Sequence, residues 1–245
     1  DFLLANDQWY RGVNMRYGPD GGVYFIDWYD RQACHRSDSN IWDRTNGRLY
    51  KVTYGAPEIV SVSLDSLSNL DLVALQLHKN DWYVRSARRL LQERGGDAQT
   101  WHALELILRH NTSVPRRLRA LWALHVSGGL HESLVLELLS DANENLRAWA
   151  IQLSLEDGNP SPKLLERFAV LAAADPSPIV RRYLASGLQR IPVQQRWELA
   201  THLVRHQEDA ADHNLPLMDW FGIEALAAAD PPRAVRLALE TPLPS

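Results

Sequence analysis

The sequence lacks several features that would assign it to a familiar class. Cys34 is its single cysteine, so an internal disulfide is excluded, although one thiol does not decide the redox compartment. No apolar run approaches the roughly 20 residues that a membrane-spanning helix needs. Neither a glycine-rich phosphate loop nor a G-x-S-x-G nucleophile motif occurs. The chain therefore carries no motif for phosphate binding or for serine hydrolase chemistry, and we expect no direct membrane span.

An excess of positive charge is also missing. The 26 basic side chains are outnumbered by 30 acidic ones, and no basic stripe stands out along the chain. Nucleic-acid-binding proteins need clustered lysine and arginine to neutralise phosphates, so nucleic acid is not expected as the main partner. The chain begins at Asp1 without an initiator methionine or a signal segment. We expect it to be a piece of a longer protein whose targeting information lies elsewhere.

The first part of the chain has the pattern of antiparallel β-structure. Alternating apolar runs occupy 23–28 and 48–52, and turn sequences precede both: Gly-Pro-Asp-Gly-Gly at 18–22 and Asn-Gly at 46–47. Alternation with period two after such turns is typical of β-hairpins. The pattern changes near Pro57. We therefore predict a small antiparallel sheet within residues 1–56 and a separate helical region over 57–245.

From Leu67 onward, apolar residues recur at helical spacing and helix breakers arrive at regular intervals. The linkers between the expected helices are short, which makes neighbouring helices antiparallel. The spacing predicts helices over 67–78, 81–95, 97–110, 115–127, 131–140, 143–157, 161–174, 177–190, 193–208, 212–229 and 231–240. The predicted fold class is mainly α, an α-α superhelix with a small N-terminal sheet.

A short phrase recurs in the second helix of each expected pair. It contains an arginine beside apolar residues, and its four copies place that arginine at 85, 119, 147 and 181: Arg85, Arg119, Arg147 and Arg181. A residue suited to capping stands six positions before three of them, at Ser113, Asp141 and Asp175. Lys79 holds that place in the first copy. Such a period, on helix pairs, indicates a solenoid in which each arginine bridges to the neighbouring repeat.

These aspartate-then-arginine helix pairs resemble HEAT repeats over about residues 66–240. The motif of that family is loose. The resemblance implies a binding surface or a spacer, and other domains of the same chain or another protein as partners.

The β-region resembles one blade of a propeller. The phrase GPDGGVYFIDW at 18–28, followed by NGRLYKV at 46–52, is similar to blades of the glucose/sorbosone dehydrogenase-like propellers. Together with DWYVRSARRLLQER at 81–94, it resembles the large membrane-bound dehydrogenases of planctomycete-type bacteria, in which HEAT-like repeats follow the propeller. This resemblance covers nearly the whole chain. It implies that residues 1–56 supply the C-terminal blade at most.

The resemblance also implies cofactors that this segment would not hold by itself. The parent protein would carry a quinone, calcium and a c-type haem, at a periplasmic or cell-envelope location. Most of a quinone or sugar site would lie in other blades. The haem motif is missing here, because Arg31 stands where C-x-x-C-H needs its first cysteine.

The polar residues of the β-region that could reach a propeller mouth include Arg11, Arg16, His35, Arg44 and Arg48. An arginine could clamp quinone carboxylates and a histidine could act as a base, which makes Arg11, His35 and Arg48 weak catalytic candidates. A structural role in tying loops together is favoured, because most polar loop residues in any fold do no chemistry. Asp20 could bind calcium, but a Pro-Asp-Gly turn needs that carboxylate for its own backbone.

One histidine pair has a spacing compatible with zinc. His202 and His206 are four residues apart on an expected helix, with Asp209 and His213 nearby. No glutamate adjoins His202 as in H-E-x-x-H, so a zinc site is disfavoured. Cys34 and His35 are adjacent and would point in different directions.

Three functions remain open: a non-catalytic interaction scaffold, part of an oxidoreductase, and a lactonase-like or carbohydrate-binding propeller without a redox role. For this chain we favour the scaffold, and for the parent protein the oxidoreductase. A quinone absorption spectrum of the parent protein would separate the second function from the third.

Overall fold

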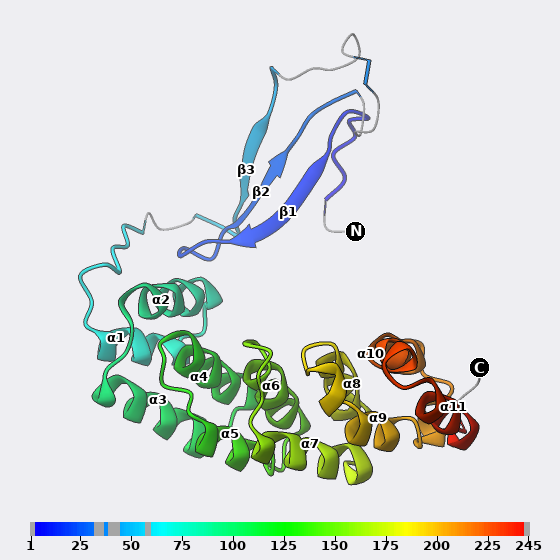
Figure 1. Ribbon diagram of the computed structural model, residues 1–245. Helices are drawn as coiled ribbons and strands as arrows, with labels where there is room; N and C mark the ends of the chain where they lie inside the picture. Colours follow the sequence, from blue (N-terminus) through cyan, green and yellow to red (C-terminus); the bar gives the residue numbers. More distant parts are fainter. Residues whose placement is uncertain (1–2, 32–36, 39–44, 57–59, 243–245) are drawn as a thin grey trace. The chain divides into compact units, whose positions relative to one another are not determined.

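A computed structural model describes residues 3–31, 37–38, 45–56 and 60–242. It divides into two compact units, Asp1–Glu93 and Arg94–Ser245. The chain is mainly helical with a small antiparallel sheet at its N-terminus, in agreement with the predicted fold class (Figure 1). The boundary between the units lies near the end of α2 (Asp81–Arg94), well after the change of sequence pattern at residue 57.

The sheet of the first unit is a three-stranded meander in the order β1-β2-β3. Its strands are β1 (Gly12–Tyr17), β2 (Val23–Asp27) and β3 (Arg48–Val52), all antiparallel. The Gly-Pro-Asp-Gly-Gly segment forms the tight turn between β1 and β2, where Gly18 N donates to Gly22 O. A bulge between Val13 and Arg16 shifts the register, and Asn14 takes a positive φ of 59° there.

The two faces of this sheet differ in burial. On one face Phe25 is buried and stacks on Tyr50 with 5.4 Å between ring centroids. On the other face Val13, Ile26 and Leu49 are paired across the three strands and are 46%, 45% and 71% exposed. No described residue covers this apolar row, which leaves one side of the sheet open to solvent.

The helical part of the first unit contains α1 (Asn69–Ala74), the 3-10 helix η2 (Leu75–Leu77) and α2 (Asp81–Arg94). Ser68 and Asp71 form a reciprocal cap at the start of α1. Gln76 is fully buried, and its Nε2 donates to the carbonyls of Leu72 and Val84, which joins η2 to α2. Asn80 Nδ2 donates to Gly18 O at 2.9 Å and so contacts the turn that follows β1.

The second unit consists of antiparallel helix pairs that stack in two rows (Figure 1). One row contains α4 (Val114–Val126), α6 (Glu144–Ser154), α8 (Pro178–Leu188) and α10 (Leu215–Ala229). The other contains α3 (Ala98–His110), α5 (Glu132–Leu138), α7 (Pro162–Ala174) and α9 (Trp197–Leu203). The helix α11 (Pro231–Glu240) packs on α10.

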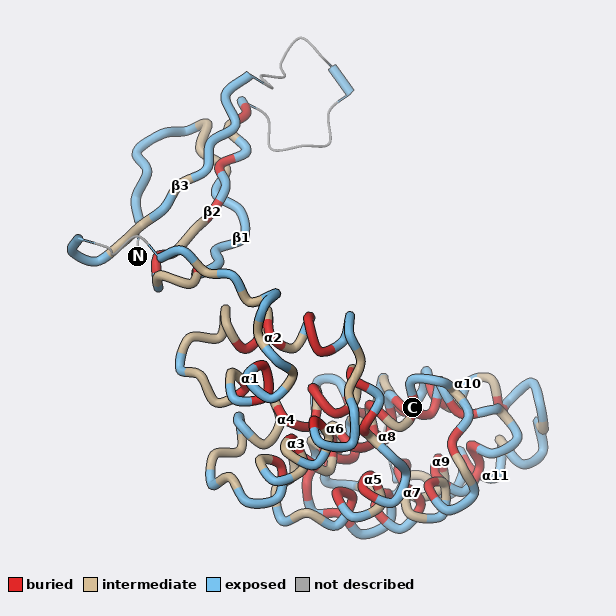
Figure 2. The backbone as a smooth tube through the Cα atoms, turned by 90° about the vertical axis from the view of Figure 1, so that its left-hand side faces the viewer, coloured by how far each residue is buried: buried red, intermediate tan, exposed pale blue. Residues whose placement is uncertain are grey.

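The core of this unit runs continuously between the two rows. Figure 2 shows buried segments concentrated where the helices face one another. The fully buried side chains are mostly leucines, with Phe168 and Ile151 among the largest. One pair alone has little apolar surface to bury within itself, so the stacking of pairs supplies most of the hydrophobic stabilisation.

A close approach fixes the first turn of this array. Trp101 Nε1 donates to Ser127 O at 3.2 Å, and the ring lies against Gly96 and Gly129. A Cβ atom at Gly129 would come within 2.3 Å of the ring, so glycine is required there by space.

One predicted helix is wrong. The segment predicted as a single helix over 193–208 is broken into η3 (Val193–Gln195), α9 and η4 (Gln207–Asp209). The Arg196 side chain explains the early break, because Nε donates to Ile191 O and Nη2 to Gln189 O, holding the chain in a tight turn before α9. The predicted start at 212 also moves to 215, because Asp212 Oδ1 accepts from the amides of Asn214 and Leu215 and forms a turn ahead of α10.

Candidate functional site

The loops before α6 and α8 share one local geometry. Asp141 Oδ1 accepts from Asn143 N at 2.8 Å, and Asp175 Oδ1 accepts from Ser177 N at 3.0 Å. In each loop the aspartate bends the chain, and the helix begins three residues later. Asn111 plays the same part before α4, since its Oδ1 accepts from Ser113 N at 2.9 Å. The side chain thereby satisfies an amide that the helix start would leave unpaired.

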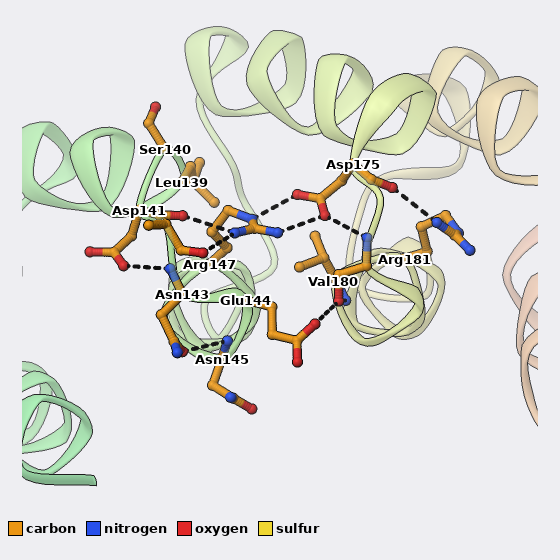
Figure 3. Close-up of polar contacts among 12 residues, drawn as sticks. Leu139, Ser140, Asp141, Asn143, Glu144, Asn145, Arg147, Asp175, Val180 and Arg181 are labelled. Carbon is orange, nitrogen blue, oxygen red and sulfur yellow. Dashed lines mark hydrogen bonds and ion pairs between the residues drawn. The ribbon is translucent and has the colours of Figure 1, made fainter. Parts of the chain in front are cut away.

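Arg147 links two such loops (Figure 3). Its Nε and Nη2 donate to the two carboxylate oxygens of Asp175 at 2.7 and 2.8 Å. Its Nη1 donates to Asp141 O, the carbonyl of its own loop, at 2.9 Å. The side chains of Arg147 and Asp175 are 11% and 3% exposed. This planar, two-bond pairing is the strongest geometry available to arginine and carboxylate, and here it joins consecutive helix pairs.

Arg181 repeats the arrangement one pair further along. Nε and Nη2 donate to Asp209 at 2.6 and 2.5 Å, while Nη1 donates to Asp175 O at 2.9 Å. The hydrogen bonds to Asp209 raise the pKa of Arg181 above its ordinary value, and Asp175 does the same for Arg147. Asp175 is therefore shared: its carboxylate accepts from Arg147 and its carbonyl from Arg181.

The corresponding arginine of α4 is Arg117, and the sequence pattern chose Arg119 instead. Arg117 Nη2 donates to Asp141 Oδ2 at 2.5 Å, and its Nε donates to Leu108 O at 2.6 Å. Arg117, Arg147 and Arg181 each stand fourth in their helices. Arg119 lies two residues later in α4. We call the three pairs Arg117–Asp141, Arg147–Asp175 and Arg181–Asp209 the arginine–aspartate ladder.

The first and last helices of the expected repeat depart from the ladder. Arg85 pairs with Asp81 of its own helix at 3.3 Å, and its guanidinium lies 5.7 Å from the Tyr17 ring centroid. In α10 the fourth residue is Met218, whose side chain has no hydrogen-bond donor and so cannot pair with a carboxylate. Ladder contacts are thus confined to α4, α6 and α8 within the described part of the chain.

Two further buried charges lie at the C-terminal end of the array. Arg196 is 8% exposed and donates to three carbonyls, those of Gln189, Ile191 and Gly222, and desolvation lowers its pKa. Asp219 is 3% exposed, and its Oδ1 has no hydrogen-bond partner among the described residues. Burial, reinforced by the charge of Asp209, raises the pKa of Asp219 to about 7.

The catalytic candidates of the β-region make structural contacts. Arg11 Nη1 donates to the carbonyls of Gln8 and Tyr10, and the Arg11 amide donates to Asp27 Oδ1. Arg48 lies over the Tyr29 ring at 3.9 Å and donates to the Tyr50 hydroxyl. His35 and Arg44 lie outside the described residues, as does Cys34.

Asp20 is held within its own turn. Its Oδ1 accepts from Gly22 N at 3.0 Å, and its Oδ2 accepts from the Tyr24 hydroxyl and pairs with Lys51. Hydrogen bonding to Lys51 is the main cause that lowers the pKa of Asp20. A carboxylate engaged in this way has little left for calcium.

The histidines proposed for zinc are not gathered around one point. His206 Nδ1 contacts Glu208 at 2.7 Å, and its Nε2 contacts Ala172 O at 2.6 Å, so both ring nitrogens are engaged. His202 lies in α9, and His213 lies in the exposed loop before α10. In the part of the chain that the structure describes, no group of three or more histidine, cysteine or acidic side chains could hold a metal ion.

A shallow pocket of about 320 Å³ lies between the C-terminal end of α3, the start of α4 and α5. Leu108, Leu134 and Leu138 line it, and Arg109 and Arg117 flank them. Both arginines are already paired, Arg109 with Glu105 and Glu137, and Arg117 with Asp141. Neither arginine of this pocket is therefore left unpaired for a ligand.

Comparison with known proteins reaches only the β-region. A family described as a domain of unknown function, DUF7133, matches residues 1–56. No curated protein matches the chain, and no solved structure matches it. The matched segment ends where the alternating pattern gives way to helices. Among the helices that the structure describes, none is long and apolar enough to cross a bilayer.

Sequence reasoning missed Arg117, Arg196 and an aromatic row along the second helices. Trp122, Trp149 and Tyr183 come from α4, α6 and α8, and consecutive rings lie 4.9 and 6.1 Å apart. A signal for Arg117 was available, since Asn111 stands six residues before it. The aromatic row had a partial signal too, because Trp149 and Tyr183 are both sixth in their helices.

Proposed function

We propose that this chain is a non-catalytic interaction and spacer module, with HEAT-type helix pairs that follow the end of a propeller of the glucose/sorbosone dehydrogenase-like kind. The observation that carries the scaffold role is the arginine–aspartate ladder. Each rung joins one helix pair to the next through a bidentate ion pair, which is largely buried at Arg147–Asp175 and Arg181–Asp209. Such links fix the spacing between pairs, which is the property that a spacer or a docking scaffold needs.

The propeller part of the proposal is supported by the sheet. A three-stranded meander of consecutive strands is what a partial blade would form. The uncovered row of Val13, Ile26 and Leu49 is suited to packing face to face against another sheet, as adjoining blades do. The non-catalytic part is supported by Arg11 and Arg48, whose guanidinium groups are engaged by neighbouring carbonyls and rings.

The spacer role is tested by measuring rigidity. Spin labels on α3 and α7, at the exposed positions Leu106 and Val170, report the distance between helix pairs by pulsed electron paramagnetic resonance, with Cys34 replaced by serine. We expect a narrow distance distribution that broadens in Arg147→Ala, because that variant removes the intervening rung. A broad distribution in the unsubstituted ladder would contradict the spacer role.

The non-catalytic role has its own assay. Purified chain, supplied with quinone and calcium, is tested for dye-coupled oxidation of a panel of aldoses and alcohols. We expect no turnover above the protein-free control, because catalysis needs several groups converging on one pocket. Turnover would place an oxidoreductase site within these residues, with Arg11, His35 and Arg48 the first positions to substitute.

A further inference from the structure

The last helix of the chain continues one row of the array. At the start of α11 the Arg233 guanidinium lies 4.3 Å from the ring centroid of Trp197, the first residue of α9. At the other end of both helices Thr241 Oγ1 donates to Val204 O at 2.7 Å. The two helices therefore run side by side in the same direction, and α11 follows α9 in the row that begins with α3 (Figure 1).

The other row ends at α10, and its last helices approach one another closely. Gly187 of α8 lies against Leu155 at the end of α6, and Gly222 of α10 lies against Leu188 of α8. A Cβ atom at the two glycines would come within 2.5 and 2.6 Å of these leucine side chains. Each of the two leucines is thus seated against a glycine of the helix that follows.

The residue in the corresponding place of α10 is not fully covered. Ile223 follows Gly222 as Leu188 follows Gly187, yet it is partly exposed, whereas Leu188 is fully buried. The ladder stops at the same helix, because Met218 has no hydrogen-bond donor. This helix therefore presents an apolar seat for a further helix, without the arginine that links the helix pairs before it.

The side of α10 turned away from α8 is mostly apolar and exposed. The buried stripe of the helix consists of Leu215, Asp219, Gly222 and Leu226. Residues two positions further along lie about 200° around the helix, on the opposite side. Three large side chains on that side, Leu217, Trp220 and Phe221, are 55%, 54% and 46% exposed. We call Leu217, Trp220, Phe221, Ile223, Glu224 and Ala228 the terminal face.

One charge interrupts the terminal face. Glu224 is exposed, and within the described part of the chain its carboxylate takes part in no hydrogen bond and no ion pair. A helix that covered the face would remove water from this carboxylate, which is costly unless a cation is supplied with it. The face therefore suits a partner that is apolar with one basic residue.

We propose that the terminal face binds an amphipathic helix of another polypeptide. Residues 217 to 228 span roughly 17 Å of α10, which about 11 or 12 residues of a docked helix would match. Its apolar side chains would pack on Trp220 and Phe221, a glycine or alanine would meet Ile223, and a lysine or arginine would pair with Glu224. This inference rests on the proposed scaffold function and names the kind of partner.

Two other occupants fit the terminal face less well. A further helix pair of the ladder type would use an arginine of α10, and Met218 stands in that place. A second copy of this chain would bring two Glu224 carboxylates into one apolar contact, because a two-fold interface repeats every residue of the face. A separate helix with a basic residue meets neither obstacle.

The test uses the whole chain and a display library of helical peptides about 16 residues long, randomised on one helix face. Enriched peptides are labelled with fluorescein and titrated by anisotropy. We expect apolar residues at i, i+3, i+4 and i+7, a small residue among them, and a lysine or arginine. Trp220→Ser should weaken binding about tenfold or more. Leu106→Ser on α3, where the side chain is as exposed as that of Phe221, is the matched control and should leave binding unchanged.

A charge exchange tests the pairing with Glu224. Glu224→Lys should weaken binding severalfold, and replacing the basic residue of the peptide with glutamate should restore most of that loss. Because Glu224 is exposed, this exchange keeps the test decisive if Trp220→Ser does not fold.

Enriched peptides without helical periodicity would overturn the proposal, as would peptides that bind Trp220→Ser and Glu224→Lys as tightly as the unsubstituted chain. Self-association of the unsubstituted chain that Trp220→Ser abolishes would assign the face to a second copy and would overturn it too. In each of those cases a narrow spin-label distribution would still support the spacer role, and a broad one would contradict it.

Discussion

Single arginines decide how the helix pairs of this chain are joined. The guanidinium of Arg147, for example, donates both to a carbonyl of its own loop and to a carboxylate of the next loop. A lysine could not reproduce this, because an ammonium group lacks the planar fork that meets both carboxylate oxygens. The contribution of each rung to stability therefore depends on geometry as well as charge.

Replacing Arg147 with alanine should destabilise the chain by about 1–3 kcal/mol. The substitution leaves the buried carboxylate of Asp175 without its ion-pair partner. Urea unfolding of Arg147→Ala and of the unsubstituted chain measures the loss of unfolding free energy. Arg182→Ala, an exposed neighbour in the array, should change stability by less than about 0.5 kcal/mol. Equal effects of the two substitutions would contradict a special role for the rung.

Asp219 should make stability depend on pH. Its folded pKa of about 7 lies above the unfolded value of 3.8, so the folded chain holds this proton more tightly. The stabilisation is complete below about pH 4 and is lost as the pH rises to about 7. Charges that face Asp219 are Asp209, which raises its pKa, and His206 and Arg181, which lower it.

The variant Asp219→Asn should therefore gain more stability at pH 8 than at pH 5, by about 2 kcal/mol. Urea unfolding at the two pH values measures the difference. Glu198→Gln on α9 replaces an exposed carboxylate and should change the unfolding free energy by the same amount at both pH values. A pH-independent effect of Asp219→Asn would mean that Asp219 is ionised in the folded chain throughout this range.

At the scale of elements, breakers and caps in the sequence located most helices, and side chains acting across loops explain the failures. Asp97 and Ser161 cap α3 and α7 as isolated motifs, so local pattern suffices there. The segment 193–208 has the periodicity of one helix, yet Arg196 folds back on Gln189 and Ile191 and breaks it. Arg196 also donates to the carbonyl of Gly222, which lies on another helix. A local sequence pattern does not encode this long-range hydrogen bond, so periodicity alone does not predict the break.

The ladder shows the same limit. The recurring phrase identifies Arg147 and Arg181, and the aspartates six residues before them support that register. In α4 the phrase at 118–122 points to Arg119, whereas the loop residue Asn111 lies six residues before Arg117. An asparagine accepts the same amide hydrogen bond, so the geometry persists where the sequence signature weakens.

The open face of the sheet leads to a prediction about association. Threonine at Val13, Ile26 and Leu49 keeps the β-branched preference for strands while removing apolar surface. We expect the unsubstituted chain to self-associate as its concentration rises, and the triple variant to remain monomeric. Sedimentation velocity measures both. Leu106→Thr with Val170→Thr, which changes scattered exposed residues on α3 and α7, should not alter association. An unsubstituted chain that stays monomeric at every concentration would refute the expectation.

Across the whole helical unit, the ladder should couple neighbouring pairs and leave distant ones independent. Arg147 and Arg181 share Asp175, whereas Arg117 and Arg181 share no partner among their hydrogen bonds. The double variant Arg147→Ala with Arg181→Ala should depart from additivity by at least about 0.5 kcal/mol. Arg117→Ala with Arg181→Ala should be additive within that margin. Unfolding free energies of the single and double variants measure both, and coupling in the second pair alone would refute the nearest-neighbour arrangement.

The ladder also has a direction, with consequences for how such a chain can lengthen by duplication. Every rung runs from the arginine of one pair to the aspartate of the pair that follows. A copied hairpin inserted between α6 and α8 would inherit both a donor and an acceptor, and its neighbours would need no compensating change. A copy placed after α10 would meet Met218, which donates nothing forward. Growth by tandem copying is thus permitted within the array and penalised beyond α10.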